Sequence, residues 1–423
     1  MISLKPLVIV LLLAFTLRVA VVISQFARLT IDTDAYLAIA ERLQAGDGFC
    51  SVSGQPSAFR PPLYPLLVAG CLQTGGSALL GGMQVLAGTA TVALTYVLAR
   101  RWGLGDTRSL AAATLVAIDP LLLNYTSQAM TETLAALLTV ALLVAWPQPA
   151  DNEPQTRRAA LAGVLLGLAA LCRPTIWAYA LLCLAAVLWR RLRTQDRRFA
   201  RPSREFLVLT TTTLLVIAPW VIRNTIVFGQ PIVTTTHGGY TLLLGNNAAF
   251  YRDVVAQPFG TTWTADKLAA WQQSVEDEIA RQGVPRDDEI ARDAAMKSLA
   301  IEWMRANPSA ALSCAWFRIR NLWSPVPLER GGVPSFVVWL VGAYYLALLL
   351  AVVFGLTGHQ LHSRGQEASL VLLLSLTLLH SLYWANARMR APAVPVLAIL
   401  AVAGAGRLRQ TSEIGTNAKI RSG

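Results

Sequence analysis

Residues 7–43 decide the fold, and they read LVIVLLLAFTLRVAVVISQFARLTIDTDAYLAIAERL. The apolar run from Leu7 to Ser24 is long enough to cross a hydrocarbon core of ~30 Å as a helix. No small-x-small cleavage site follows this run, so we predict a retained first span and not a removed signal peptide. The apolar residues of the next segment share one helical face, which predicts an amphipathic helix on the membrane surface: Tyr36, Ile39, Ala40 and Leu43.

Similar apolar runs recur along the whole chain. Of its 423 residues 54% are hydrophobic and only 14% are charged, against roughly 25% charged in soluble domains, which excludes a water-soluble enzyme. The sequence predicts an all-α polytopic membrane protein with about ten transmembrane helices; because segment 159–172 is short, nine or eleven stay open. The predicted spans are 7–24, 79–99, 108–125, 130–146, 159–172, 174–189, 206–222, 334–355, 367–385 and 391–406.

The basic residues predict the orientation of these spans. The net charge of +12 comes from 36 Lys and Arg against 24 Asp and Glu. With the N-terminus placed inside, half of the cations fall on the inner side. Of the others, eleven lie in the long segment 223–333, which is exempt from the positive-inside rule, and seven lie elsewhere. We therefore predict that both termini are cytoplasmic, and the charge excess needs no nucleic acid to explain it.

This topology divides the chain into four regions. Residues 1–222 form a transmembrane core whose first outer loop, 26–78, carries two interfacial helices, the second at 61–73. Residues 223–333 form a small outer, periplasmic helical domain with a helix break at Gly283–Pro285. Residues 334–406 are the C-terminal spans, and 407–423 are an inner tail.

The first outer loop carries the residues that indicate chemistry. Asp32 and Asp34 stand before the amphipathic helix, where one of them is expected to cap it and the other to act as a general base. Arg60 opens the second interfacial helix and is expected to bind either anionic lipid head groups or one specific phosphate.

Several short motifs, in their order along the chain, resemble those of a known family, the GT-C membrane glycosyltransferases that take a sugar from a polyprenyl phosphate. Within it the chain is most similar to the branch with protein O-mannosyltransferases and the lipid A aminoarabinose transferase. The motifs are Asp32-x-Asp34-x-Tyr36, Arg60-Pro61-Pro62-Leu63-Tyr64-Pro65, Met130-Thr131-Glu132, Leu171-Cys172-Arg173-Pro174, Trp220-Val221-Ile222-Arg223, Gly238-Gly239-Tyr240-x4-Gly245-Asn246-Asn247 and Arg388-x-Arg390-x-Pro392.

The resemblance implies roles for individual residues. The family's catalytic carboxylate maps to Asp32, four residues before Tyr36; many members have Glu directly after it, whereas Thr33 and then Asp34 follow here, so both acids stay candidates, with Asp32 preferred. Arg60 and Arg173 map to the residues that hold the donor phosphate. No family motif supplies a metal ligand set, and a divalent metal stays an open alternative.

Other residues are expected to line the cavity, each with a simpler alternative: Glu132 as the start of a helix, His237 as an ordinary loop histidine, and Arg388 and Arg390 as interface anchors. Tyr36, Tyr64 and Arg223 complete this expected set. The five cysteines have no CxxC pair, so neither a disulfide framework nor a cysteine metal site is predicted.

Together these features predict an inverting glycosyltransferase that moves a sugar from a polyprenyl-phosphate carrier to a lipid, glycan or protein acceptor on the outer face of a bacterial inner membrane. Its partners would be that donor, the acceptor and the bilayer, with no nucleic acid. The alternative is a lipid-linked sugar flippase or secondary transporter, which ten spans would suit equally well.

Overall fold

A computed structural model describes residues 5–147, 155–194, 204–328, 333–356, 361 and 363–405, and all regular structure within these ranges is helical. The inner arginines expected between 195 and 203 and the inner tail 407–423 lie outside the described residues. The predicted fold class, an all-helical membrane protein, is confirmed.

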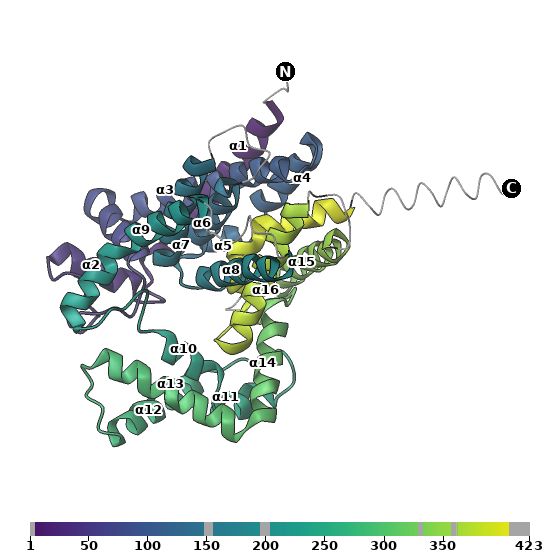
Figure 1. Cartoon of the computed structure of the whole chain (residues 1–423). Coiled ribbons are helices and arrows are strands. Elements are labelled where there is room, and N and C mark those ends of the chain that lie inside the picture. Colours follow the sequence, from purple (N-terminus) through teal and green to yellow (C-terminus); the bar gives the residue numbers. More distant parts are fainter. Residues whose placement is uncertain are drawn as a thin grey trace.

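Most helices form one bundle, which fills the upper part of Figure 1. Their bounds are α1 (Lys5–Ser24), η1 (Phe26–Thr30), α2 (Tyr36–Ala45), α3 (Leu63–Arg101), α4 (Asp106–Ala117), α5 (Pro120–Thr126), α6 (Glu132–Ala145), α7 (Gln155–Cys172), α8 (Ile176–Thr194), α9 (Arg204–Phe228), α15 (Ser335–Leu356), α16 (Ser363–Leu382) and η4 (Ala387–Ala393), which continues as one helix to Ala405.

Six of the described helices are long and apolar enough to cross a membrane, or seven if α4 and α5, which meet at 49°, form one broken span. The predicted count of ten is higher because it includes 130–146, 159–172 and 174–189, which became α6, α7 and α8. Helix α6 has only 14 residues, nearly all of them buried, and at 1.5 Å per residue it spans about 21 Å, short of the ~30 Å of a hydrocarbon core. Hydropathy alone does not separate such a core helix from a span.

The first outer loop forms the two predicted interfacial helices, and the second is joined to a span. Helix α2 buries Tyr36, Ile39 and Ala40, the face that the sequence predicts. The predicted segments 61–73 and 79–99 are one helix, α3, with a break at Gly76, whose φ of 64° belongs to the left-handed region that glycine adopts most easily.

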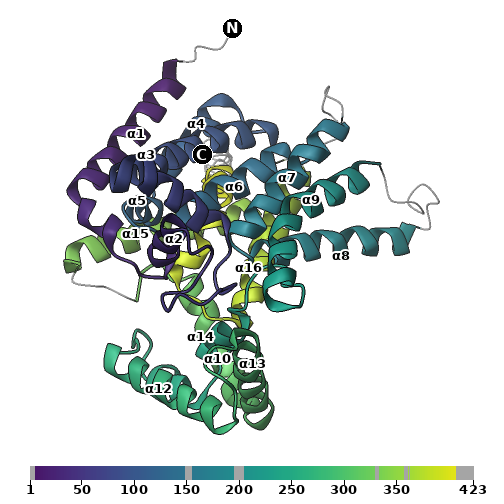
Figure 2. The same cartoon turned by 90° about the vertical axis from the view of Figure 1, so that its left-hand side faces the viewer.

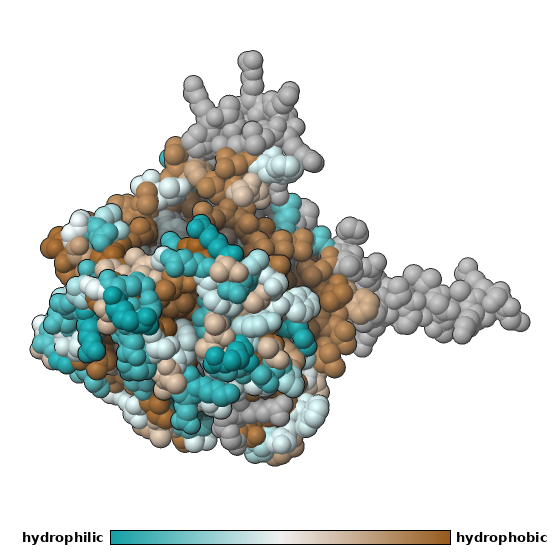
Figure 3. Space-filling model, turned by 90° about the horizontal axis from the view of Figure 1, so that it is seen from below, coloured by the Kyte–Doolittle hydropathy of each residue, from teal (hydrophilic) through white to brown (hydrophobic). Residues whose placement is uncertain are grey.

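A second group of helices lies below the bundle in Figure 1 and is reached through α14. Seen from that side, its surface is mostly hydrophilic and is bordered by hydrophobic side chains of the bundle (Figure 3). The predicted break at Gly283–Pro285 separates α12 from α13. The division of the chain into domains stays a prediction. The bounds are α10 (Gly238–Gly245), α11 (Ala248–Phe250), η3 (Tyr251–Val255), α12 (Ala265–Arg281), α13 (Glu289–Ala306) and α14 (Pro308–Leu322).

Helices α7 and α9 pack closely at Gly163 and Gly167. A Cβ added at Gly163 would collide with the backbone oxygen of Leu209 and the hydroxyl of Thr212 on α9. We expect Gly163→Ala to destabilise the bundle by about 1–3 kcal/mol, because the two helices must move apart.

Gly82→Ala is the matched control for this change. Nothing lies within 4 Å of a Cβ at Gly82, which is also helical, and Ala stabilises a helix interior by roughly 0.5–1 kcal/mol relative to Gly. Thermal unfolding in one detergent compares the two variants, and equal midpoints would contradict the close approach at Gly163.

Candidate active site

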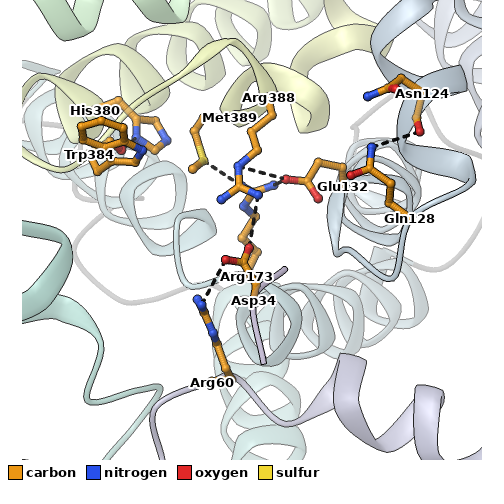
Figure 4. Close-up of polar contacts among 10 residues, drawn as sticks. All are labelled: Asp34, Arg60, Asn124, Gln128, Glu132, Arg173, His380, Trp384, Arg388 and Met389. Carbon is orange, nitrogen blue, oxygen red and sulfur yellow. Dashed lines mark hydrogen bonds and ion pairs between the residues drawn. The ribbon is translucent and has the colours of Figure 1, made fainter. Parts of the chain in front are cut away.

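Five charged side chains form one continuous row at the end of the bundle that faces α10–α14. Asp34 lies 3.2 Å from Arg60 through one oxygen and 3.2 Å from Arg388 through the other. Glu132 continues the row, 3.8 Å from Arg388 and 3.4 Å from Arg173. Figure 4 shows the Arg388 guanidinium between the two carboxylates. The Glu132 side chain is 1% exposed and the other four are 13–19% exposed, so the row lies in a largely dry cleft where charge interactions are strong.

A local turn decides which of the first two acids enters this row. Ala35 has φ 61°, the only non-glycine residue with positive φ in the described chain, and such strained residues concentrate at functional sites. On one side of the turn Asp32 is exposed, and its Oδ2 accepts the backbone N–H of Ala38 in the first turn of α2 at 2.9 Å, although the N-cap residue itself is Ala35. On the other side Asp34 points into the row, so of the two neighbouring acids Asp34 is the one that contacts the arginines.

Arg60 is carried by a loop that Glu289 holds in place. The Glu289 carboxylate, in the first turn of α13, accepts the hydroxyl of Ser57 at 2.6 Å, the N–H of Ala58 at 2.8 Å, and the hydroxyl of Thr236. The Arg60 guanidinium lies 5.4 Å from the centre of the Tyr36 ring and 5.1 Å from that of Phe59. The loop thus presents Arg60 between two aromatic rings, close to Asp34.

Arg173 follows directly after α7. Its backbone N–H donates to Ala169 at 2.7 Å, so it continues the last turn of the helix, and its guanidinium lies 2.7 Å from the Met389 sulfur. A cation at a helix C-terminus is stabilised by the backbone carbonyls there. Arg173 is thereby fixed between α7 and η4.

The segment η4 carries Arg388 and is anchored by the fully buried Arg390. Arg390 donates to the carbonyls of Leu322 and Ser324 at 3.2 and 2.7 Å, and its guanidinium lies 4.0 Å from the centre of the Tyr345 ring. The Tyr345 hydroxyl donates to Asp119, 3.0 Å from each oxygen. Arg390 was expected at the cavity, and it does border a cavity, but its guanidinium is used to hold η4.

Three other expected residues support the site without joining the row. Tyr36 and Tyr64 pack edge to face with ring centres 5.1 Å apart, and the Tyr64 hydroxyl accepts from Gln84 at 3.0 Å. Arg223 donates to the carbonyls of Ser57 and Phe49 at 2.8 and 2.7 Å. Arg223 therefore ties the Arg60 loop to α9 and does not reach the carboxylates.

His237 packs against Phe59, with ring centres 4.2 Å apart, and its Nδ1 is buried without a hydrogen-bond partner among the described residues. Burial lowers the pKa of this imidazole well below its usual range, and the positive charges of Arg60 and Arg388 lower it further. The ring is therefore neutral at physiological pH.

This shift predicts a pH-dependent stability. Because the folded-state pKa of His237 lies below the ~6.5 of an unfolded histidine, the unfolded chain binds more protons between these values, and folding stability falls as the pH drops below about 6.5. We expect a lower melting temperature at pH 5.5 than at pH 7.5, with a smaller difference in His237→Asn. Equal pH differences in the two proteins would contradict the prediction.

Cavities reach the row from two sides. A cavity of about 410 Å³ between α1, α5 and α15 is bordered by Arg388. A narrow space of about 20 Å³ at Arg173 and a larger one of about 240 Å³ both have Tyr179 in their walls, so they lie in line along α8 and α16. Figure 2 shows α8 on the side of the bundle away from α1 and α15.

The residues of the row do not fit a divalent metal. Carboxylates are ligands that divalent cations prefer, yet the described residues contain no group of three or more His, Cys, Asp or Glu placed to hold one. The position between Asp34 and Glu132 is taken by the Arg388 guanidinium.

Two residues that hold the site in place, Met389 and Glu289, could not be expected from the sequence. Met389 stands at the unspecified position of Arg388-x-Arg390, and the motif gives no sign that its sulfur contacts Arg173. Glu289 begins a charged surface helix, and nothing in its local sequence signals a contact with a loop 231 positions earlier.

This bundle, with a charged cleft at one end of its spans, is a GT-C-type membrane protein fold. Residues 60–222 match the family model described as dolichyl-phosphate-mannose-protein mannosyltransferase. The matched segment contains Arg60, Glu132 and Arg173 of the row and covers less than half of the chain. No curated protein matches the chain.

Solved structures support the fold. The oligosaccharyltransferase of Archaeoglobus fulgidus tethered to an acceptor peptide is 15% identical, with a TM-score of 0.53 over 97% of this chain and 50% of that one. The same enzyme in complex with Zn and sulfate is 15% identical, with a TM-score of 0.52 over 96% of this chain and 50% of that one. ArnT from Cupriavidus metallidurans bound to undecaprenyl phosphate is 14% identical, with a TM-score of 0.41 over 98% of this chain and 80% of that one. The chain spans about half the length of the archaeal enzyme, so this likeness concerns the fold alone.

Proposed function

We propose that this chain is an inverting glycosyltransferase that moves a sugar from a polyprenyl-phosphate carrier to an acceptor on the outer face of a bacterial inner membrane. The observation that carries the proposal is the row Arg60–Asp34–Arg388–Glu132–Arg173, which combines three cations and two carboxylates at the mouths of apolar cavities. Both termini would be cytoplasmic, and α10–α14 would lie outside.

The arginines suit a phosphate that becomes more negative during the reaction. The carrier phosphate in the donor is a diester with one negative charge, and it gains charge when the sugar leaves. Arg60 and Arg173 would bind its oxygens, and cations fixed in a partly dry cleft stabilise such developing charge without reorganising. Buried N–H groups of Arg60 and Arg388 have no hydrogen-bond partner among the described residues and are suited to bind an anion.

Asp34 is the proposed base. The acceptor oxygen or nitrogen attacks C1 of the sugar, the bond from C1 to the phosphate oxygen breaks, and the electron pair stays on the phosphate. The acceptor proton passes to the Asp34 carboxylate. Phosphate binding to Arg60 would draw this arginine away from Asp34 and leave a carboxylate oxygen available to the acceptor. One displacement of this kind inverts the configuration at C1.

The cavities suggest where the two substrates lie. The carrier chain would run along α8 and α16, because those cavities begin at Arg173 and are lined mainly by apolar residues. The acceptor would approach Asp34 from the cavity at Arg388 or from α10–α14. The acceptor would be a lipid, a glycan or a protein.

A transfer assay tests the proposal. Purified full-length protein is incubated with labelled polyprenyl-phosphate mannose or aminoarabinose and a membrane extract as the source of acceptors. We expect label to leave the carrier and appear in a new glycosidic bond of inverted configuration. The proposal fails if every donor stays intact while the wild-type protein is folded.

The alternative, a flippase or transporter, has one feature in its favour. The bent pair α4–α5 has Asp119 at its break, and broken helices with ionisable residues mark many transporter sites. Here, however, Asp119 already accepts from Leu122 and Tyr345. Sealed vesicles distinguish the two functions, because a flippase moves labelled carrier across the bilayer without forming a new bond.

A further inference from the structure

The positive charge between the Asp34 and Glu132 carboxylates comes from a side chain of the protein, the Arg388 guanidinium. Arg388 contacts Asp34 through Nη1 at 3.2 Å and faces Glu132 through Nε at 3.8 Å. A guanidinium can contact two carboxylates in this way because its donors spread in one plane. The position is the one in which a metal ion would bind two acidic ligands.

The charges of the row oppose any additional cation. Three arginines and two carboxylates leave a net charge of one positive unit. The singly charged donor phosphate would bring the occupied site to neutrality, whereas a divalent metal would raise the unoccupied site to three positive units among groups that are at most 19% exposed. The row is thus suited to an anion and unsuited to a metal.

Arg388 is also held in place before any substrate arrives. Two residues further on, Arg390 is 1% exposed, donates to two backbone carbonyls and stacks on Tyr345, which donates in turn to Asp119. Between these two arginines, Met389 contacts Arg173. Such prior fixing is what makes a charged group effective in a transition state.

We propose that Arg388 is the resident catalytic cation of this site, so that transfer requires no metal. It bridges Asp34 and Glu132 as a divalent ion would, and it stabilises the negative charge of the departing phosphate. The proposal rests on the proposed function and extends it to the source of the positive charge. It also assigns Glu132 a positioning role, since its carboxylate orients Arg388 and Arg173 from a fully buried position.

Metal dependence is tested first on the wild-type protein. We expect the transfer rate to stay within twofold after exhaustive chelation and after addition of Mg²⁺ or Mn²⁺. Independently of activity, electron paramagnetic resonance with Mn²⁺ alone tests for a metal site at the row. We expect the wild-type protein to show no saturable Mn²⁺ binding of the kind that Glu132→Gln would remove. Loss of transfer on chelation with recovery on adding metal, or such saturable Mn²⁺ binding, would overturn the proposal. Absence of transfer under every condition would instead concern the proposed function, and the Mn²⁺ measurement would still decide the cation.

Chemical rescue then tests Arg388 itself. We expect Arg388→Ala to lower kcat by at least 100-fold, and free guanidinium at low millimolar concentration to restore part of it while Mn²⁺ restores none. Arg281→Ala is the control, because this exposed residue of α12 lies outside the row and should show neither loss nor rescue. An Arg388→Ala protein with wild-type turnover, or one rescued by Mn²⁺ and not by guanidinium, would refute the role. If Arg388→Ala does not fold, Arg388→Gln also removes the charge, and its kcat is compared with and without Mn²⁺; wild-type turnover or recovery with Mn²⁺ would refute the role.

Discussion

Asp34→Asn is expected to lower the transfer rate by about 10²- to 10⁴-fold, the usual contribution of a positioned general base. Its side chain is the one of the two neighbouring acids that reaches Arg60 and Arg388. The amide retains the size of the carboxylate but accepts no proton. The measurement is kcat at saturating donor, with the melting temperature showing that the variant is folded.

Asp32→Asn is the matched comparison, because it makes the same change two residues earlier. Asp32 accepts the N–H of Ala38, and the side-chain oxygen of Asn is also an acceptor, so this variant should keep most of its activity. An inactive Asp32→Asn together with an active Asp34→Asn would return the catalytic role to Asp32, the residue that the family pattern prefers.

Arg173→Gln is expected to raise KM for the donor by about 10- to 100-fold, since a hydrogen bond to a charged group contributes about 1.5–3 kcal/mol. The change also leaves the buried Glu132 with Arg388 as its remaining ion-pair partner. Direct binding of undecaprenyl phosphate, followed by native mass spectrometry, should weaken in parallel.

Arg42→Gln is the control for this loss of charge. Arg42 is an exposed residue of α2 that pairs with Asp47, so its loss removes a cation from the same loop region without touching the row. Equal weakening of undecaprenyl phosphate binding in both variants would mean that only the general positive charge of this face attracts the carrier.

Much of the architecture follows from local sequence. The amphipathic spacing from Tyr36 to Leu43 and the break at Gly283–Pro285 depend on neighbouring residues, and both are found in the structure. The number of spans depends instead on burial. Helix α6 is as apolar as a span because other helices surround it, and the sequence does not reveal that environment.

Of the candidate site, too, one part follows from the sequence and another part depends on tertiary contacts. The motifs placed Asp34, Arg60, Glu132, Arg173 and Arg388 near one another, because family order and topology bring them to one end of the spans. Which of them pair depends on tertiary contacts, as between Arg388 and Asp34, 354 positions apart. The choice between Asp32 and Asp34 depends on a positive φ at Ala35, a backbone conformation that alanine adopts only when the fold imposes it.

The row of charges has a consequence for biosynthesis. Its members are made in the order Asp34, Arg60, Glu132, Arg173 and Arg388, and the last follows the first by 354 residues. At 5–20 residues per second, this interval is about 20–70 s. In the later part of that interval, once Arg173 has been made, the nascent chain carries Glu132 with Arg173 but without the arginine that joins Glu132 to Asp34. The cleft is therefore completed only when the segment that begins the final helix has been made.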